Sequence, residues 1–218
     1  MSSLIFATDE NQIIVATDTL AVTLEGEPFA FVSKAIYIPH LRTIVAGTGA
    51  SGFANSWALT ISNRMILKGI MNLDYHTPEG LRRLWACYKK EYSPSEEITT
   101  TVYQFGLSEE TSKVKSFAYR SINDFTSEPV SYGIGVKPKC SIPEGTLLEA
   151  LPAMMEEQRA NQELMPPELR IYIGGEIQVL HLTAQCCTSF VAAQFQDFIE
   201  HENIIFENHA NAKRKQSP

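Results

Sequence analysis

The stretch SSLIFATDENQIIVATD, residues 2–18, decides the fold that the sequence predicts. It holds two short apolar runs, Leu4–Ala7 and Ile13–Ala16, and the polar segment Asp9–Asn11 between them favours a turn. Two such runs flanking a turn signal are typical of a β-hairpin. The sequence therefore predicts an antiparallel strand pair that begins almost at the first residue.

The order of elements beyond this hairpin favours an α+β protein. Further strands are expected at residues 29–38, 43–46, 98–105, 114–119 and 130–134, and strands 169–173 and 177–182 are expected to form a hairpin around two glycines. Helices are expected at residues 53–70, 77–88, 147–163 and 188–199. Because strands and helices come in separate runs, the pattern favours antiparallel sheets covered by helices. Residues 1–207 are predicted to form one domain, and residues 208–218 a polar, disordered tail.

Composition and charge exclude several classes of protein. The chain has 218 residues and a formal net charge of -7, and an acidic surface disfavours nucleic-acid or anionic-membrane partners. No window approaches the roughly 18 apolar residues of a spanning helix, and the first residues lack signal-peptide features. We therefore expect a soluble, cytoplasmic protein. Its cysteines and histidines lack metal-ligand spacing, so no metal or organic cofactor is expected.

Three polar residues stand where plain strands do not require them. Ser2 follows the initiator Met, Asp18 ends the second strand, and Lys34 interrupts the apolar run of the third. Asp18 lies sixteen residues after Ser2, and Lys34 sixteen residues after Asp18. A glycine-rich loop, GTGASG at residues 47–52, follows the fourth strand. Each feature alone has an ordinary structural explanation. Ser2 is simply the second residue, and Asp18 could close a turn. Lys34 could extend to solvent from an edge strand, and the glycines could allow a tight entry into the following helix.

Together these features resemble the proteasome β-type subunits and their bacterial proteasome-like relatives, which are N-terminal nucleophile (Ntn) hydrolases. The match consists of the nucleophile–Asp–Lys spacing, the glycine loop and the late IGGEIQVLHL segment at residues 173–182, and it covers roughly residues 2–199. The resemblance implies a four-layer αββα sandwich of two antiparallel sheets covered by helices. It also implies a homo-oligomeric ring or stack, with a separate ATPase partner where folded substrates must be unfolded. The helix expected at residues 53–70 is a natural contact surface for such an assembly.

The resemblance assigns chemical roles to four residues. Removal of Met1 would free the Ser2 α-amine, whose ordinary pKa of about 7.7–8.0 suits a general base for the Ser2 hydroxyl. Lys34 would favour the anionic nucleophile, and Asp18 would orient Lys34 and compensate its charge. The backbone N–H of Gly49 would stabilise the oxyanion. Residues matching the family's substrate-facing positions are Ala21, Val32, Gly47 and Ser51, which suit a modest apolar side chain or acyl group of a peptide or amide substrate.

Three functions stay open from the sequence. The first is an amide-bond hydrolase of the threonine-peptidase type that uses Ser2. The second is a catalytically inactive subunit with a structural or binding role, because Ile134, Arg170 and Ile173 occupy positions where active members carry polar residues. The third is a small-molecule amidase or acylase on the same fold, which would act as a monomer or dimer.

Overall fold

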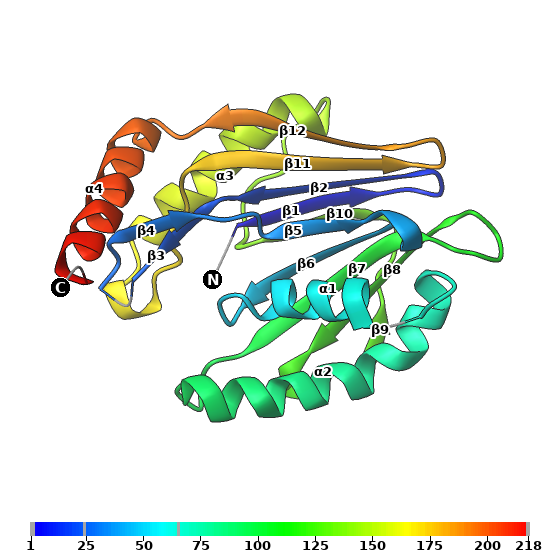
Figure 1. The fold of residues 1–218 in the computed structure, drawn as a ribbon. Helices are drawn as coiled ribbons and strands as arrows, with labels where there is room; N and C mark the ends of the chain where they lie inside the picture. The colour runs from blue at the N-terminus through cyan, green and yellow to red at the C-terminus, as the bar shows by residue number, and fades with distance from the viewer. Residues whose placement is uncertain (1–2, 24, 65, 217–218) are drawn as a thin grey trace.

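The computed structural model describes residues 3–23, 25–64 and 66–216, and these contain two five-stranded sheets and a separate strand pair (Figure 1). The first sheet has the order β10 (Gly133–Lys137), β1 (Leu4–Thr8), β2 (Gln12–Asp18), β11 (Glu176–Thr183) and β12 (Cys187–Gln194). The second has the order β5 (Ala35–Ile38), β6 (Thr43–Gly49), β7 (Thr100–Leu107), β8 (Val114–Arg120) and β9 (Ser127–Pro129). The separate pair is β3 (Leu20–Val22) and β4 (Pro28–Phe31).

The helices are α1 (Phe53–Arg64), α2 (Ile70–Tyr92), α3 (Leu147–Glu163) and α4 (Phe198–Gln216), with short 3-10 turns at Pro39–Leu41, Ser121–Asn123 and Pro167–Leu169. All strand pairs are antiparallel. The predicted α+β class with antiparallel sheets and covering helices is therefore confirmed.

The predicted N-terminal hairpin is present. β1 pairs with β2 from Leu4 opposite Thr17 to Thr8 opposite Ile13. Asp9 closes the turn, since its carboxylate accepts the backbone N–H of Asn11 at 2.7 Å. The hairpin thus places the start of β1 beside the end of β2.

Three apolar clusters hold the layers together. One lies between the two sheets and includes Phe6 of β1 and Phe105 of β7. A second lies between the second sheet and helices α1 and α2, around Trp57. The third joins α3 to the first sheet through Met154 and Met155. Helices α1 and α2 therefore cover the second sheet and α3 covers the first (Figure 1).

The helix predicted at residues 188–199 is wrong. Residues 187–194 form β12, which pairs with β11 so that Phe190 lies opposite Val179. A tight turn from Thr183 to Cys186, closed by a 2.9 Å backbone hydrogen bond, returns the chain directly along β11. Sheet pairing thus outweighed the apparent helical spacing of the apolar residues.

The predicted hairpin of strands 169–173 and 177–182 is also wrong. Only its second half is a strand, β11, whereas residues 170–175 are not in a strand. The Gly174 carbonyl instead accepts the backbone N–H groups of Thr19 and Leu20 at 3.2 and 3.0 Å. This segment is therefore attached to the junction of β2 and β3.

Several boundaries differ from the predictions. The run at 29–38 divides into β4 and β5, the strand expected at 130–134 starts at Gly133, and α1 ends at Arg64. Helix α2 starts at Ile70, before the expected cap at Thr77, and contains Pro78. The hydroxyl of Thr77 donates to the Leu73 carbonyl. Leu73 and Leu81 are buried in the cluster between α2 and the second sheet. This burial of α2 outweighs the cost of the proline inside the helix.

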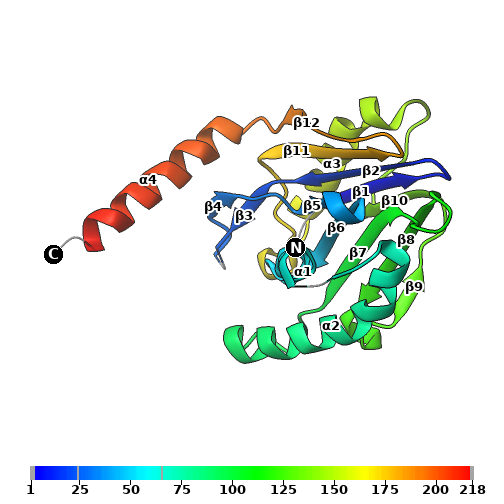
Figure 2. The same ribbon diagram turned by 45° about the vertical axis from the view of Figure 1, so that its right-hand side comes forward.

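The prediction of a disordered tail at residues 208–218 differs from the structure, in which α4 continues to Gln216. The segment Ala212–Lys215 consists of strong helix formers, and basic residues near a helix C-terminus are favourable. Figure 2 shows α4 extending away from the two sheets. The polar composition therefore did not prevent a helix.

Candidate functional site

Asp18 is the centre of the candidate site. It is the last residue of β2, and its side chain is completely buried. Its Oδ1 accepts the backbone N–H of Ser3 at 2.9 Å, and its Oδ2 accepts the Lys34 ammonium at 2.8 Å and the Gly174 N–H at 3.3 Å. Burial raises the pKa of Asp18 above its usual value, while Lys34 and the two amides act in the opposite direction.

Lys34 reaches Asp18 from the segment just before β5. The β3–β4 pair leads the chain out and back, and the Val32 N–H donates to the Thr19 carbonyl at 2.8 Å. The Lys34 ammonium also donates to the Leu20 carbonyl at 2.6 Å. The structure therefore brings together two residues that the sequence analysis selected, as a largely buried ion pair.

Ser3 makes a further contact at the start of β1, with Gln158, which the sequence analysis missed. Its hydroxyl donates to the side-chain oxygen of Gln158, a completely buried residue of α3. The Gln158 amide nitrogen in turn donates to the Pro138 carbonyl. A glutamine within an apolar helix face was the one available sequence signal, but it does not identify its partner.

Ser2 lies outside the described residues, so its predicted role stays a prediction. Its neighbour Ser3 is in hydrogen-bond contact with Asp18, which in turn contacts Lys34. Of the three spaced residues, the structure therefore brings together Asp18 and Lys34, beside the start of β1.

The late glycine pair contributes to the same cluster. Besides the bond from Gly174 to Asp18, Gly175 has a φ of +80°, and a Cβ there would lie 2.4 Å from the Thr19 hydroxyl. Glycine therefore permits the close approach of this segment to the β2–β3 junction.

Gly47 and Gly49 are in the last part of β6, and Ser51 lies between β6 and α1. A Cβ on Gly47 would lie 2.4 Å from the Cβ of Ala54 in α1, so this glycine allows close helix–sheet contact. Gly49 has a φ of +100° and lies opposite Thr100. Asn55 of α1 donates to the Ser33 carbonyl at 2.9 Å, which attaches this helix start next to Lys34. The oxyanion role of Gly49 stays a prediction.

The remaining predicted substrate-binding residues lie near the β3–β4 pair. Ala21 is in β3 opposite Ala30, and Val32 follows β4 with its side chain partly exposed. Val32 is therefore two residues from Lys34, and Ala21 is three residues from Asp18. Their contact with a substrate stays a prediction.

Ile134, Arg170 and Ile173, which occupy positions where the resembling family carries polar residues, each have structural contacts. Ile134 lies opposite Ala7, whereas Leu4 lies opposite Lys137, so Ile134 is three residue pairs along β1 from its start. Ile173 is buried in the cluster under α3. Arg170 donates to the carbonyls of Glu163 and Met165 at 2.9 and 3.1 Å.

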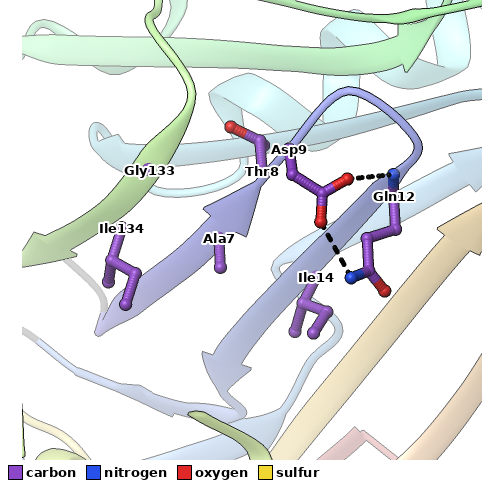
Figure 3. A pocket seen from close by; sticks show the side chains of 7 residues that line it. All are labelled: Ala7, Thr8, Asp9, Gln12, Ile14, Gly133 and Ile134. Carbon is purple, nitrogen blue, oxygen red and sulfur yellow. Dashed lines mark hydrogen bonds between the residues drawn. The ribbon is translucent and has the colours of Figure 1, made fainter. Parts of the chain in front are cut away.

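Two hollows lie away from the Asp18–Lys34 cluster. A small one of about 120 Å³ is at the β1–β2 turn, where Ala7, Ile14 and Ile134 form its wall and Asp9 bonds to Gln12 (Figure 3). A larger one of about 500 Å³ is at the β8–β9 edge and includes Phe117. Neither includes a predicted site residue, so neither supports the predicted substrate pocket.

Over the ranges that the structure describes, no group of three or more His, Cys, Asp or Glu side chains is arranged to hold a metal ion. None of the helices in the same ranges has the length and apolar character needed to cross a membrane. The chain matches no protein-family model and no curated protein sequence.

Proposed function

We propose that this chain is a proteasome-like Ntn hydrolase with the four-layer αββα fold, and that it cleaves amide bonds through Ser2 after removal of Met1. Two antiparallel sheets packed through a shared apolar cluster, with helices on their outer sides, support the fold part of the proposal. The peptide or amide substrate is the one that the resemblance of the sequence to this family implies.

One observation carries the proposal: the buried Asp18 carboxylate connects the start of β1 to Lys34. Asp18 accepts the Ser3 N–H and the Lys34 ammonium on its two oxygens. A buried ion pair at this position is not required for sheet packing, and replacing such pairs by apolar residues is often neutral or stabilising. The Asp18–Lys34 pair contacts Ser3, the residue directly after Ser2, and this position favours a catalytic role.

The proposed reaction needs only groups of the chain, substrate and water. The Ser2 hydroxyl oxygen attacks the substrate carbonyl carbon, and its proton passes to the neutral α-amine of Ser2. The ammonium formed there gives the proton to the leaving amine as the C–N bond breaks. Water then hydrolyses the acyl ester and restores Ser2. Lys34 stabilises negative charge near the nucleophile, and Asp18 holds Lys34 in place.

The test is the intact mass of the purified protein before and after treatment with a β-lactone, which acylates N-terminal nucleophiles. The expected result is loss of the Met1 mass and addition of one inhibitor molecule. Ser2→Ala should lose the adduct, whereas the control Ser62→Ala, which removes an exposed hydroxyl of α1, should keep it.

Retention of Met1, or an adduct that persists in Ser2→Ala, would contradict the proposal. A free but unreactive Ser2 would favour the second candidate, a non-catalytic subunit of the same fold. The buried apolar position of Ile173, where active members of the resembling family carry a polar residue, supports that candidate.

A further inference from the structure

Strand β12 forms one border of the first sheet. It pairs with β11 on one side, and among the residues that the structure describes no strand lies beside it on the other (Figure 1). Helix α4 follows β12 but turns toward β4, where Phe198 stacks on Phe31 with ring centroids 4.9 Å apart. Residues 188–191 are all exposed. β12 therefore has a free edge.

The hydrogen-bond pattern shows which backbone groups of β12 point to this free edge. In an antiparallel pair, residues that bond to the neighbouring strand alternate with residues that point away from it. The Thr183 N–H donates to the Cys186 carbonyl at 2.9 Å, so this pair closes the β11–β12 turn and starts the alternation. Thr188 and Phe190 therefore bond toward β11. The outward N–H and C=O groups belong to Cys187, Ser189 and Val191.

The other border strands of the two five-stranded sheets carry features that hinder pairing with a further strand. β10 ends at Lys137, β9 contains Glu128 and Pro129, and β5 is only four residues long. Charges, prolines and short length are the usual protection of sheet edges. β12 has eight residues, CTSFVAAQ, with neither a charge nor a proline, and its pairing with β11 is regular over residues 187–191. Its free edge therefore suits a further strand.

The spacing of the outward residues indicates which strand fits. When two copies of β12 run antiparallel about a two-fold axis at Ser189, Ser189 lies opposite itself and Cys187 lies opposite Val191. Every outward residue then faces an outward residue, so their N–H and C=O groups can exchange hydrogen bonds. No like charges meet along the pair, because β12 has no charged residue. The partly exposed Phe190 rings lie diagonally across the axis, within the reach of aromatic side chains.

We propose that β12 pairs antiparallel with β12 of a second copy of this chain, centred on Ser189, and joins the first sheets of the two copies into one continuous sheet. Backbone hydrogen bonds fix the direction and register, and Phe190 and Val191 add apolar contact. The pairing uses neither Asp18 nor Lys34, so it holds whether or not the chain is a hydrolase.

The first test measures the mass of the full chain by light scattering during size-exclusion chromatography, over a range of protein concentrations. We expect a species that contains an even number of copies. Ser189→Lys should weaken self-association about tenfold or more, because two ammonium groups then face each other across the axis. The matched control Ser131→Lys adds the same charge at an exposed serine just before β10, at the opposite border of the sheet, and should leave the mass unchanged.

The second test relies on the axis, since only the residue on the axis meets itself. Ser189→Asp alone should also dissociate the dimer, because two carboxylates then meet. A mixture of Ser189→Asp and Ser189→Lys should restore a dimer with one copy of each, which native mass spectrometry identifies by its mass. Both variants should keep the circular dichroism of the unaltered chain, which shows that each is folded.

The outcomes separate the alternatives. A monomer at every concentration overturns the proposal and leaves the free edge to a strand of another protein. A dimer that is insensitive to Ser189→Lys, or a mixture that stays monomeric, places the contact elsewhere and also overturns it. Recovery of the mixed dimer supports it. The β-lactone experiment on Ser2 has a separate readout, so a failure of the proposed function leaves this result unaffected.

Discussion

The Asp18 carboxylate has no contact with solvent and is surrounded by three donors from Ser3, Lys34 and Gly174. Such an arrangement makes the loss of one charge costly, because its buried partner is then uncompensated. Thr19 adds rigidity beside it, since its hydroxyl accepts the Glu176 N–H at 2.8 Å. The cluster is thus held from several strands at once.

Replacing Asp18 by Asn should lower the free energy of unfolding by about 3 kcal/mol, because the Lys34 ammonium then lacks its counter-charge. Urea denaturation measures the change. The double variant with Lys34→Met should recover part of the loss. The control Glu79→Gln breaks the exposed pair with Arg83 and should cost less than about 0.5 kcal/mol. Equal losses in Asp18→Asn and Glu79→Gln would refute this account.

Among single residues, the sequence predicted Asp18 and Lys34 but not Gln158 or Gly174. The first two were found because charged residues interrupt apolar strands at a regular spacing. Gln158 comes from α3, far along the chain, and nothing in the sequence indicates that its amide joins Ser3 to Pro138. Long-range contacts of this type depend on how the layers pack.

At the scale of elements, the connection from β6 to α1 depends on a glycine backbone. Gly49→Ala should destabilise the chain by about 2–4 kcal/mol, since a Cβ would lie 2.1 Å from the Thr99 carbonyl at a φ of +100°. The control Gly52→Ala also has a positive φ but open space around it, and should cost about 1 kcal/mol. Thermal melting compares the two. A smaller loss for Gly49→Ala than for Gly52→Ala would contradict the steric argument.

The attachment of α4 to α3 should depend on pH. Burial alone would raise the pKa of Asp197, but the hydrogen bonds and charge of Arg159, with nearby His201, outweigh it and hold this pKa below its ordinary value. A depressed carboxyl pKa stabilises the folded state above the unfolded pKa of about 3.9, and this stabilisation is lost as pH falls through the folded value.

We therefore expect Asp197→Asn to lower the melting temperature at pH 7. The difference in melting temperature between the variant and the unaltered chain should narrow as pH falls below about 4. Melting curves at pH 7, 5 and 3 measure it. A gap that stays constant over this range would show that the ionised carboxylate is not the stabilising form.

At the scale of the whole molecule, the cluster between the sheets should dominate stability. Phe105 is completely buried there and contacts the ring of Phe6, with centroids 4.9 Å apart. Phe105→Ala should cost about 3–5 kcal/mol through lost burial and the cavity left behind. The control Ile122→Ala removes an exposed side chain and should stay within about 0.5 kcal/mol. Urea denaturation compares them, and a small loss for Phe105→Ala would place the main core elsewhere.

The sequence by itself determined the local elements whose signals are short-range. The β1–β2 hairpin follows from two apolar runs around Asp9–Asn11, and α3 spans residues 147–163 as its apolar spacing predicts. Only the tertiary structure decided that residues 187–194 pair as β12, that Gly174 attaches to the β2–β3 junction, and that Ser3 joins Asp18 to Gln158. The physical reason is that local propensity acts within a few residues, whereas the pairing of β11 with β2 joins residues up to 171 positions apart, Gln12 and Thr183.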